Sequence, residues 1–545
     1  MTVRVPLWLP LNTAFAAASA ALLSISFPPH RTPFTAWLGF IPIFFILRQK
    51  GTLRTLPFIA VAGIAFHAVT MGWTARFHPL AVPFIAVVYG LFFFSVPLFL
   101  TGFVIRRSPA LAVIAAPAFW VAFELLRTSW SLKFPFGVLG TTQYHWPRLI
   151  QFADLTGVWG VSFLIVLVNA VAFRLCELVV AHRGNRNQRS AIGAALVLVI
   201  VMASVFFYGT QKIRAGTASR PGGLDVVLVQ TLSEKVRPGS ETFDTLDERE
   251  YALRQLETYL RLARRYRPDL IVFPENALQT FVSVDPELRD ERSIAALNTL
   301  SRDARDSETS ILIGTLETAR NETRVLRYNA AYLFDRRGDL AGVYRKRERV
   351  PFGEYYPFGP FFSNLREELE TRSGALFLDA GTNDSLLKVA GADGESYRFG
   401  VLICFESTLG SPARDYARGG ADFLVNITDD LWSHSRAAVE QHAVFSVFRA
   451  IENRLPVLRA ANGGVTAFIT STGHFRTSIP AFVPGVLASH VPLELNRNRT
   501  IYTRYGDWFA WLCVATTAAL LAWIAARSTP LSSGGTPRRA SASPR

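Results

Sequence analysis

The sequence is short of charged residues and of cysteine. Asp, Glu, Lys and Arg make up 18% of its 545 residues, whereas a soluble globular protein carries roughly 25%, and this disfavours a purely cytosolic protein. Three cysteines are too few for a disulfide-stapled scaffold or for a cysteine-rich zinc or iron–sulfur site. No internal repeat of solenoid period is present.

Half of the residues are hydrophobic, and they crowd into the first 210 positions and one stretch near the end. A membrane-spanning helix needs about 20 mostly apolar residues. Eight runs approach or reach that length, and the second is short enough to be a re-entrant segment. A cleaved signal peptide is the alternative for the first run, but further runs follow it directly. The runs are residues 9–27, 33–47, 56–74, 80–105, 110–126, 159–180, 191–208 and 508–526.

The basic residues between these runs predict how the chain crosses the membrane. With the first residues inside, the inside loops hold most of the Lys and Arg, as the positive-inside rule requires. Residues 211–506 are then predicted to lie outside, which in a bacterium is the periplasmic side of the inner membrane. These loops also explain the net charge of +15, so we expect no nucleic-acid partner. The inside residues are Arg48, Lys50, Arg54, Arg106, Arg107, Arg183, Arg186, Arg189 and, in the tail, Arg527, Arg538, Arg539 and Arg545.

Residues 224–506 alternate between strand and helix patterns. Strands mixed with helices and hairpins are typical of an α/β sandwich with mixed sheets. The predicted helices are 246–266, 293–306 and 436–453, and residues 329–334 and 341–344 are predicted to pair as a hairpin. Further strands are predicted at 224–230, 269–273, 309–314, 397–403, 421–427, 456–460 and 465–470.

Three reactive residues stand at matching places in this region. Glu275, Lys346 and Cys404 each come just after an apolar strand pattern, and open α/β sheets bind their ligands at the carboxyl ends of strands. Cys404 is also the only cysteine outside the predicted spans, since Cys176 and Cys513 lie in the sixth and eighth runs. It therefore has no disulfide partner in its own region.

These residue types can together perform covalent acyl chemistry. A thiol is a weak nucleophile until it loses its proton. A carboxylate can take that proton, and an ammonium group can stabilise the negative charge that develops. Glu275, Lys346 and Cys404 would then be base, electrophilic stabiliser and nucleophile of a thioester pathway. Each also has an ordinary explanation, as a helix cap, a solvated cation and an inert buried thiol.

The segments around these residues resemble the nitrilase superfamily of carbon–nitrogen hydrolases, with its Glu-Lys-Cys triad. Residues 350–354 (Val-Pro-Phe-Gly-Glu) follow Lys346 as they do in that family, and residues 462–466 (Asn-Gly-Gly-Val-Thr) resemble its turn. The whole chain is similar to the apolipoprotein N-acyltransferase family, the membrane-bound branch. Further matches are Glu124, Arg127, Phe134 and Pro135, residues 157–164, and Thr500, Tyr502, Arg504, Gly506 and Asp507.

The resemblance implies a fold and a set of roles. The fold is a helical bundle of about eight spans with an inserted nitrilase-like αββα sandwich. Glu275, Lys346 and Cys404 would be catalytic, Glu354 and Glu406 would support them, and Trp432 and Phe405 would bind substrate. No metal or cofactor is implied. Two departures from the family pattern are Phe405, where Tyr is common, and residues 428–433 (Thr-Asp-Asp-Leu-Trp-Ser) in place of an Asn-Asp-x-Trp-Phe stretch.

The resemblance also implies an activity and a domain plan. The expected reaction is a ping-pong N-acyl transfer from a phospholipid, through a Cys404 thioester, to the α-amine of a diacylglyceryl-modified N-terminal cysteine on an apolipoprotein. The expected plan is a membrane domain with about seven spans at 1–210, a periplasmic catalytic domain at 211–506, a transmembrane helix at 507–527 and a disordered cytoplasmic tail at 528–545.

Two other functions are consistent with parts of the sequence. One is a membrane-anchored carbon–nitrogen hydrolase, such as an amidase, that uses water in place of an amine. It gives no reason for eight apolar runs. The other is a transporter or receptor with an inactive binding domain, which would have no use for Glu275, Lys346 and Cys404 together.

Overall fold

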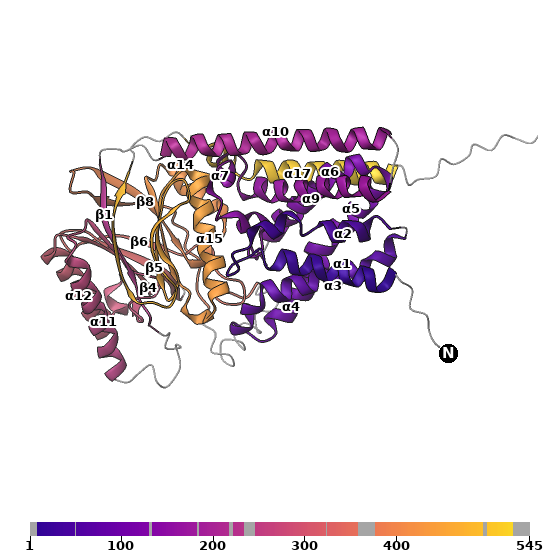
Figure 1. Ribbon diagram of the computed structural model, residues 1–545. Helices are drawn as coiled ribbons and strands as arrows, with labels where there is room; N and C mark the ends of the chain where they lie inside the picture. The colour runs from indigo at the N-terminus through magenta and orange to yellow at the C-terminus, as the bar shows by residue number, and fades with distance from the viewer. Residues whose placement is uncertain are drawn as a thin grey trace, which may run out of the picture.

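The computed structural model consists of a helical half and a sandwich of two β-sheets, joined end to end (Figure 1). The sandwich is inserted between the long helix that ends at Gly216 and the final helix, which begins at Trp508. This confirms the predicted fold class. The structure describes residues 8–49, 51–129, 133–181, 185–216, 222–233, 246–322, 324–357, 377–493 and 499–526, so the predicted tail at 528–545 lies outside the described residues.

Six helical stretches within the described residues are long and apolar enough to cross a membrane. Two shorter apolar stretches, α1 (Trp8–Ser24) and a 3-10 turn (Pro33–Trp37) followed by α2 (Ile41–Leu47), coincide with the first two predicted runs. All eight predicted runs are thus helical, while the number of spans and the exact domain limits stay a prediction. The six are α3 (Thr52–Thr70), α4 with α5 (Ala81–Arg107), α6 (Pro109–Thr128), α9 (Val158–Ala181), α10 (Asn185–Gly216) and α17 (Trp508–Ala526).

The fourth run is continuous but not a regular α-helix. A π-helical turn, Tyr89–Phe94, joins α4 (Ala81–Val88) to α5 (Ser95–Arg107). Pro97 lacks the N–H that would bond to the preceding turn, which favours such an irregularity. Gly90 in the π-turn lies against Gly63 of α3, where a Cβ on Gly63 would come 2.5 Å from the carbonyl oxygen of Gly90. Small residues let two membrane helices approach this closely.

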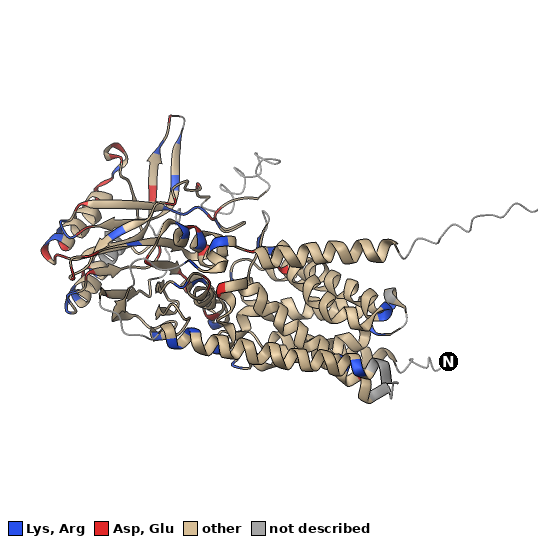
Figure 2. Ribbon diagram, turned by 90° about the horizontal axis from the view of Figure 1, so that it is seen from above, with Lys and Arg blue, Asp and Glu red and all other residues tan. Residues whose placement is uncertain are grey.

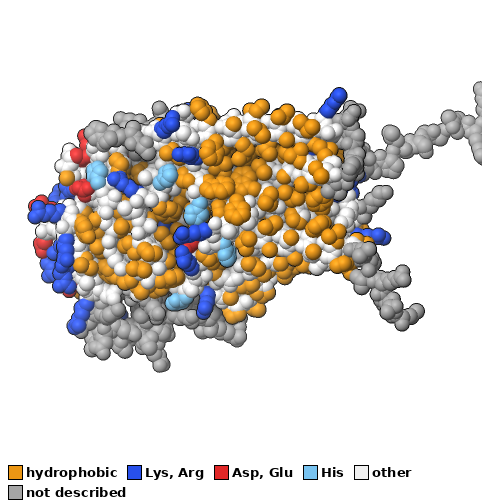
Figure 3. All heavy atoms as spheres, in the orientation of Figure 1, with side chains coloured by type: hydrophobic (Ala, Val, Ile, Leu, Met, Phe, Trp, Pro, Cys, Tyr) orange, Lys and Arg blue, Asp and Glu red, His pale blue; other side chains and the backbone are white. Residues whose placement is uncertain are grey.

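The surface of the helical half suits a lipid environment. Hydrophobic side chains cover most of its face in Figure 3. Figure 2 shows Lys and Arg at the end of the bundle away from the sandwich, whereas both signs of charge gather on the sandwich. The helix α10 runs along the outside of the bundle to the sandwich (Figure 1). Only 6% of its most apolar 18-residue stretch is buried. An exposed apolar helix of this length is what a bilayer would cover.

The sandwich is built from two mixed sheets with parallel strands at their centres. The first has the order β13-β1-β2-β4-β5-β6, with β3 also paired to β4, and the second has the order β12-β11-β10-β9-β8-β7. Parallel central strands are buried on both faces and read as continuous apolar runs, which is why β1, β2, β8 and β9 were predictable. The bounds are β1 (Gly223–Gln230), β2 (Leu270–Val272), β3 (Phe281–Val282), β4 (Ser310–Arg320), β5 (Val325–Phe334), β6 (Leu340–Arg345), β7 (Leu387–Ala390), β8 (Ser396–Ile403), β9 (Phe423–Asp429), β10 (Val457–Asn462), β11 (Thr466–Ile469), β12 (Phe475–Ile479) and β13 (Gly485–Pro492).

Helices cover the outer face of each sheet. Residues of α11 (Leu246–Arg264) and α12 (Glu291–Asp306) share a buried core with the first sheet. The helices α14 (Gly410–Gly419) and α15 (Arg436–Asn453) belong with the second sheet, and α15 stands between that sheet and the helical half (Figure 1). The predicted αββα order is confirmed, and so is the hairpin, because β5 and β6 pair antiparallel.

The structure also contains strands that the sequence patterns did not predict. The strands β3, β7, β12 and β13 went unrecognised, and β4 continues to Arg320, six residues beyond its predicted end. β7 and β12 lie at the edges of the second sheet, and β13 pairs antiparallel with β1 over the whole length of both strands. Edge strands are exposed on one side and mix polar with apolar residues, so their pattern is weak.

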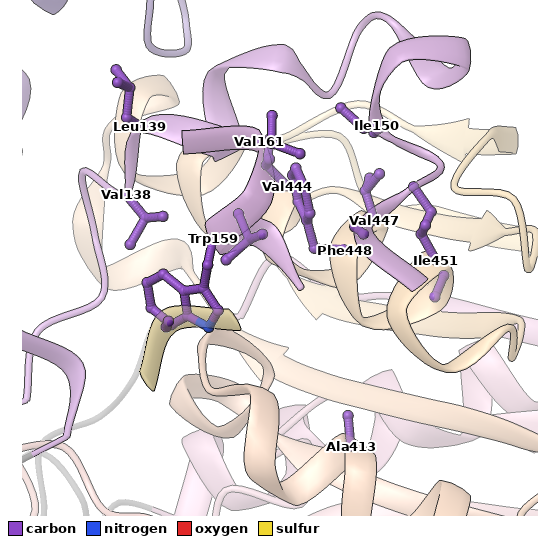
Figure 4. Packing of buried hydrophobic residues seen from close by; sticks show 14 of the residues in the cluster. Val138, Leu139, Ile150, Trp159, Val161, Ala413, Val444, Val447, Phe448 and Ile451 are labelled. Atoms are coloured by element: carbon purple, nitrogen blue, oxygen red, sulfur yellow. The ribbon is translucent and has the colours of Figure 1, made fainter. Parts of the chain in front are cut away.

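The two halves are joined by a continuous buried core. Figure 4 shows side chains of α15, among them Val444 and Phe448, packed beside Val161 of α9 and Ile150 of α7 (Pro147–Ile150). Polar contacts surround this core. The backbone N–H of Val158 donates to Glu452 Oε1 at 3.0 Å, and Arg454 binds both Gln151 and Asp154. The sandwich is therefore fixed to the bundle through α15.

Glu124 and Arg127, matched above to a membrane-domain motif, are both buried in α6. They do not form an ion pair with each other in the structure. Glu124 Oε1 instead accepts hydrogen bonds from Trp120 Nε1 at 3.0 Å and from the backbone N–H of Leu139 at 2.7 Å. Glu124 therefore ties the end of α6 to the loop that follows it.

Candidate active site

The three reactive residues meet between the two sheets. Glu275 follows β2 and Lys346 follows β6, both in the first sheet, whereas Cys404 follows β8 in the second. Glu275 and Lys346 are buried and Cys404 is partly buried. Lys346 Nζ lies 3.8 Å from Glu275 Oε1. Residues that are 58 to 129 positions apart in the chain are thus brought together at the ends of these strands.

Glu354 holds the ammonium group of Lys346. Its Oε1 lies 2.7 Å from Lys346 Nζ, and its Oε2 accepts the backbone N–H of Val350 at 2.9 Å. The segment 350–354 therefore folds back on the lysine that precedes it. The sequence motif predicted a supporting role for this residue, and the geometry supplies a physical basis for one.

Asn329 of β5 is a residue of the site that the sequence analysis missed. Its Nδ2 donates to Glu275 Oε1 at 2.7 Å and to Glu354 Oε1 at 3.2 Å. The backbone N–H of Lys346 in turn donates to the carbonyl oxygen of Asn329 at 2.8 Å. The only sequence signal was a polar residue inside the buried stretch 328–332 (Tyr-Asn-Ala-Ala-Tyr), which alone does not say what the amide contacts.

Both oxygens of Glu275 are occupied by donors. Oε1 accepts from Asn329, and Oε2 accepts the backbone N–H of Asp429 at 2.6 Å. Asp429 ends β9 of the opposite sheet, so this bond fixes Glu275 relative to the sheet that carries Cys404. The carboxylate of Glu275 is thereby held between donors from both sheets.

The charges in the site keep Lys346 protonated and Glu354 ionised. Burial lowers the pKa of Lys346, but the negative charges of Glu354 and Glu275 outweigh this, so its pKa lies above the usual value. Burial raises the pKa of Glu354, but the neighbouring Lys346 lowers it by more, so the net pKa is below the usual value. The pair remains an ion pair at neutral pH.

The thiol of Cys404 is protonated at rest. Burial raises the pKa of Cys404, the charge of Glu275 raises it further, and Lys346 opposes this only in part, so the pKa lies well above the usual range. A resting thiolate is therefore not available. The proton must leave as the sulfur attacks, and Glu275 is the carboxylate whose charge acts most strongly on that sulfur.

Glu406 organises the backbone on both sides of the site. Its Oε2 accepts the N–H of Ile403 at 2.8 Å, and its Oε1 accepts the N–H of Arg347 at 2.8 Å and the hydroxyl of Tyr344 at 2.7 Å. It is fully buried. Glu406 thus ties the residue before Cys404 to the residues beside Lys346, although no hydrogen bond joins it to the lysine side chain.

The two predicted substrate-binding residues differ in exposure. Trp432 is 37% exposed, and its ring lies 6.1 Å from the rings of Trp73 and Phe77, which belong to the helical half. Phe405 is 5% exposed. Trp432 is therefore placed where the two halves meet, whereas Phe405 has little free surface. Their substrate-binding role stays a prediction.

Among the described residues, no group of three or more His, Cys, Asp or Glu side chains is arranged to hold a metal ion.

The sandwich with its site between the sheets is the fold of the carbon–nitrogen hydrolases, whose family model matches residues 241–498. A second family model, the apolipoprotein N-acyltransferase N-terminal domain, matches residues 19–171. The apolipoprotein N-acyltransferase of Geobacter metallireducens is 32% identical over 522 residues, which cover 93% of this chain and 94% of that protein. This chain belongs to the apolipoprotein N-acyltransferase family.

Other relatives are similar over most of their length. Apolipoprotein N-acyltransferase 1 of Treponema denticola is 28% identical over 92% of this chain and 94% of its own. The apolipoprotein N-acyltransferase of Chlorobaculum tepidum is 27% identical over 96% of both chains. Among solved structures, an amidase from Nesterenkonia sp. matches 51% of this chain and 94% of its own with 18% identity and a TM-score of 0.36.

Proposed function

We propose that this protein transfers an acyl chain from a membrane phospholipid to the α-amine of the N-terminal diacylglyceryl-cysteine of apolipoproteins, by a ping-pong reaction through a thioester on Cys404. The observation that carries the proposal is the placement of Glu275, Lys346 and Cys404 together in a site whose sandwich is fixed to an apolar helical bundle. The names of the relatives support the acceptor.

The first half-reaction forms the thioester. Glu275 takes the proton of the Cys404 thiol as the sulfur attacks the ester carbonyl of the phospholipid. The negative charge on the carbonyl oxygen is stabilised by Lys346, which Glu354 holds in place at 2.7 Å. When the tetrahedral intermediate collapses, the ester C–O bond breaks, and the proton on Glu275 passes to the oxygen of the departing lysophospholipid.

The second half-reaction consumes the thioester. The amine of the acceptor attacks the same carbonyl carbon, and Glu275 takes a proton from the nitrogen. The C–S bond then breaks, and the proton returns to the sulfur of Cys404, so the enzyme ends as it began. An ester and an amine have become an amide and a lysophospholipid, and no further reactant is needed.

The location of the site suits two substrates with acyl chains. Trp432 lies beside Trp73 and Phe77 where the sandwich meets the helical half. Aromatic residues favour the level of the lipid headgroups. A phospholipid and a lipid-modified peptide could both approach from the bilayer at this level, which explains why an amidase-type sandwich is joined to a membrane bundle.

The test follows the acyl group by mass. Purified protein incubated with a phospholipid of one defined acyl chain should gain the mass of one acyl group on a peptide containing Cys404. Adding a diacylglyceryl-cysteine peptide should remove that mass and N-acylate the peptide, whereas the same peptide with a blocked amine should not. Discharge to free fatty acid at the same rate with and without the acceptor would support a hydrolase instead, and no adduct at all would refute the thioester.

We also propose that the sandwich lies on the periplasmic side of the bacterial inner membrane. In a variant with all three native cysteines replaced, a single cysteine at Arg337, whose side chain is 81% exposed on the sandwich, should react in intact cells with a thiol reagent that crosses only the outer membrane. A cysteine at Arg54, exposed at the start of α3, should react only after the inner membrane is opened. The reverse pattern would place the site in the cytoplasm.

A further inference from the structure

A buried histidine of α15 contacts the backbone of Cys404. His442 belongs to α15, is buried, and lies with Nε2 3.1 Å from the backbone carbonyl oxygen of Cys404. Its Nδ1 lies 2.7 Å from Asp430 Oδ1. The hydroxyl of Ser407 donates to the same carbonyl oxygen at 2.9 Å and lies 3.2 Å from His442 Nε2.

Hydrogen-bond acceptors face both ring nitrogens of His442, Asp430 at Nδ1 and the carbonyl oxygen of Cys404 at Nε2. Asp430 is held ionised, because Arg459 Nη2 lies 2.7 Å from its Oδ2 and, although burial raises the pKa of Asp430, His442 and Arg459 lower it by more. The ionised carboxylate can only accept a hydrogen bond, which the Nδ1–H of His442 donates. The carbonyl oxygen of Cys404 is also an acceptor, and Nε2–H is the group of the ring that can donate to it.

The backbone that His442 holds is strained. Cys404 has a φ of 54°, in the left-handed region that residues with a side chain rarely adopt. Such a conformation persists only where the surroundings fix it. The carbonyl oxygen of Cys404 is fixed by donors from His442 and Ser407. Because C=O and N–H of a trans peptide point to opposite sides, the same bonds also set the direction of the N–H of Phe405.

The same helix is anchored to the helical half one residue earlier. Gln441 Nε2 donates to the carbonyl oxygens of Pro28 and Thr70, and Trp73 Nε1 donates to Gln441 Oε1 at 3.2 Å. The ring of Phe136, also from the helical half, lies 6.0 Å from that of His442. The position of His442 is thus set by the membrane-facing part of the protein on one side and by Asp430 on the other.

We propose that His442, oriented by Asp430, is a positioning residue that holds the nucleophile in its reactive conformation through the carbonyl oxygen of Cys404. It touches neither substrate nor the sulfur. Its effect is on the rate at which Cys404 becomes acylated and not on how tightly the lipid binds. The inference rests on the proposed function for the identity of the acyl donor. The role of the contact between His442 and Cys404 does not depend on that donor.

Two substitutions of His442 by amide residues test the contact with Cys404 separately from the contact with Asp430. In His442→Gln, the amide nitrogen can reach the place of Nε2 and still donate to the carbonyl of Cys404. In His442→Asn, the shorter amide reaches only the place of Nδ1 and can bond to Asp430 alone. We expect His442→Gln to form the thioester within about 10-fold of the parent, and His442→Asn to lose about 100-fold, the order that misplacement near reacting atoms can cost.

The measurement is single-turnover acylation at several phospholipid concentrations, with thermal melting of each variant as a check on folding. The loss in His442→Asn should lie in the rate at saturating lipid, with the half-saturating concentration unchanged. Equal rates in the Asn and Gln variants, or a loss confined to the half-saturating concentration, would overturn the proposal. If either variant melts early, Ser407→Ala, which removes the other side-chain donor to the same carbonyl, gives a second measurement and should slow acylation less than His442→Asn.

A second readout keeps the inference separate from the proposed function. Alkylation of Cys404 by iodoacetamide needs the nucleophile but no lipid. It should be slower in His442→Asn than in His442→Gln. If the parent forms no acyl adduct but this order is seen, the proposed substrate is wrong and the positioning role stands. If the adduct forms but alkylation is equal in both variants and the parent, the positioning role is wrong.

Discussion

Replacing Cys404 by alanine should abolish both the acyl adduct and the transfer of the acyl chain. The proposed pathway has no route around the thioester, and loss of a covalent nucleophile can cost on the order of 10⁶-fold in rate. The fold should persist, because the partly buried side chain loses only one sulfur atom. Intact mass after incubation with phospholipid and N-acylation of an acceptor peptide, measured on one preparation, test this.

The matched control is Cys513→Ala, since that cysteine lies in α17 and should leave the transfer unchanged. Cys404→Ser should trap little or no acyl group, because a carboxylate is too weak a base to take the proton of an alcohol readily. Transfer by Cys404→Ala within a few-fold of the parent would mean that Cys404 is not the nucleophile.

Replacing Glu275 by glutamine should lower the rate of acylation by about 10³- to 10⁴-fold, toward the upper part of the range that general base catalysis supplies. The cause is twofold. Glutamine cannot take the proton of a thiol whose pKa is raised by burial. In the native protein, Asn329 Nδ2 and the N–H of Asp429 each donate to one oxygen of the Glu275 carboxylate. The glutamine amide has only one oxygen, so its NH2 group must face one of these two donors.

Two comparisons make the result for Glu275 specific. Glu354→Gln removes the charge beside Lys346 but leaves the base, so a smaller loss of about 100-fold is expected from misplacement of the ammonium group. Glu348→Gln, on the loop just after Lys346, removes a partly exposed partner of Lys133, and the rate should stay within a few-fold. Acylation rates and melting curves of the three variants decide between these roles. A rate for Glu275→Gln equal to that of Glu348→Gln would exclude Glu275 as the base.

The meeting of Glu275, Lys346 and Cys404 between the sheets was predictable because each residue follows an apolar strand that could be recognised locally. Glu354 was predictable because it belongs to a short motif, Pro-Phe-Gly-Glu, close to Lys346. Asn329 was not predictable from local pattern, because its amide meets Glu275 only through the register of β5 with β4 and β6. One polar residue in a buried strand has the same signature whether it is structural or part of a site.

His442 was hidden for a related reason. The helix α15 is buried on nearly all sides, so its polar residues cannot be sorted into an inner and an outer face by periodicity. Its contact with Cys404 depends on how α15 packs across the second sheet, which is a tertiary fact. His434, the histidine next to the stretch 428–433, is exposed and lies outside the hydrogen bonds that hold Cys404.

The pairing of β1 with β13 has a consequence for how the protein is made. These strands are hydrogen-bonded from end to end, Gly223 opposite Pro492 and Gln230 opposite Gly485, yet the ribosome delivers them more than 250 residues apart. Proteins with such distant pairings fold slowly, and newly made domains generally fold as whole units. The first strand of the sandwich must therefore wait, with one edge open, until almost the entire domain has been synthesised. The helix α17 emerges last of all, so the bundle and the sandwich are completed at nearly the same moment, and a chain that stops short of β13 leaves both unfinished.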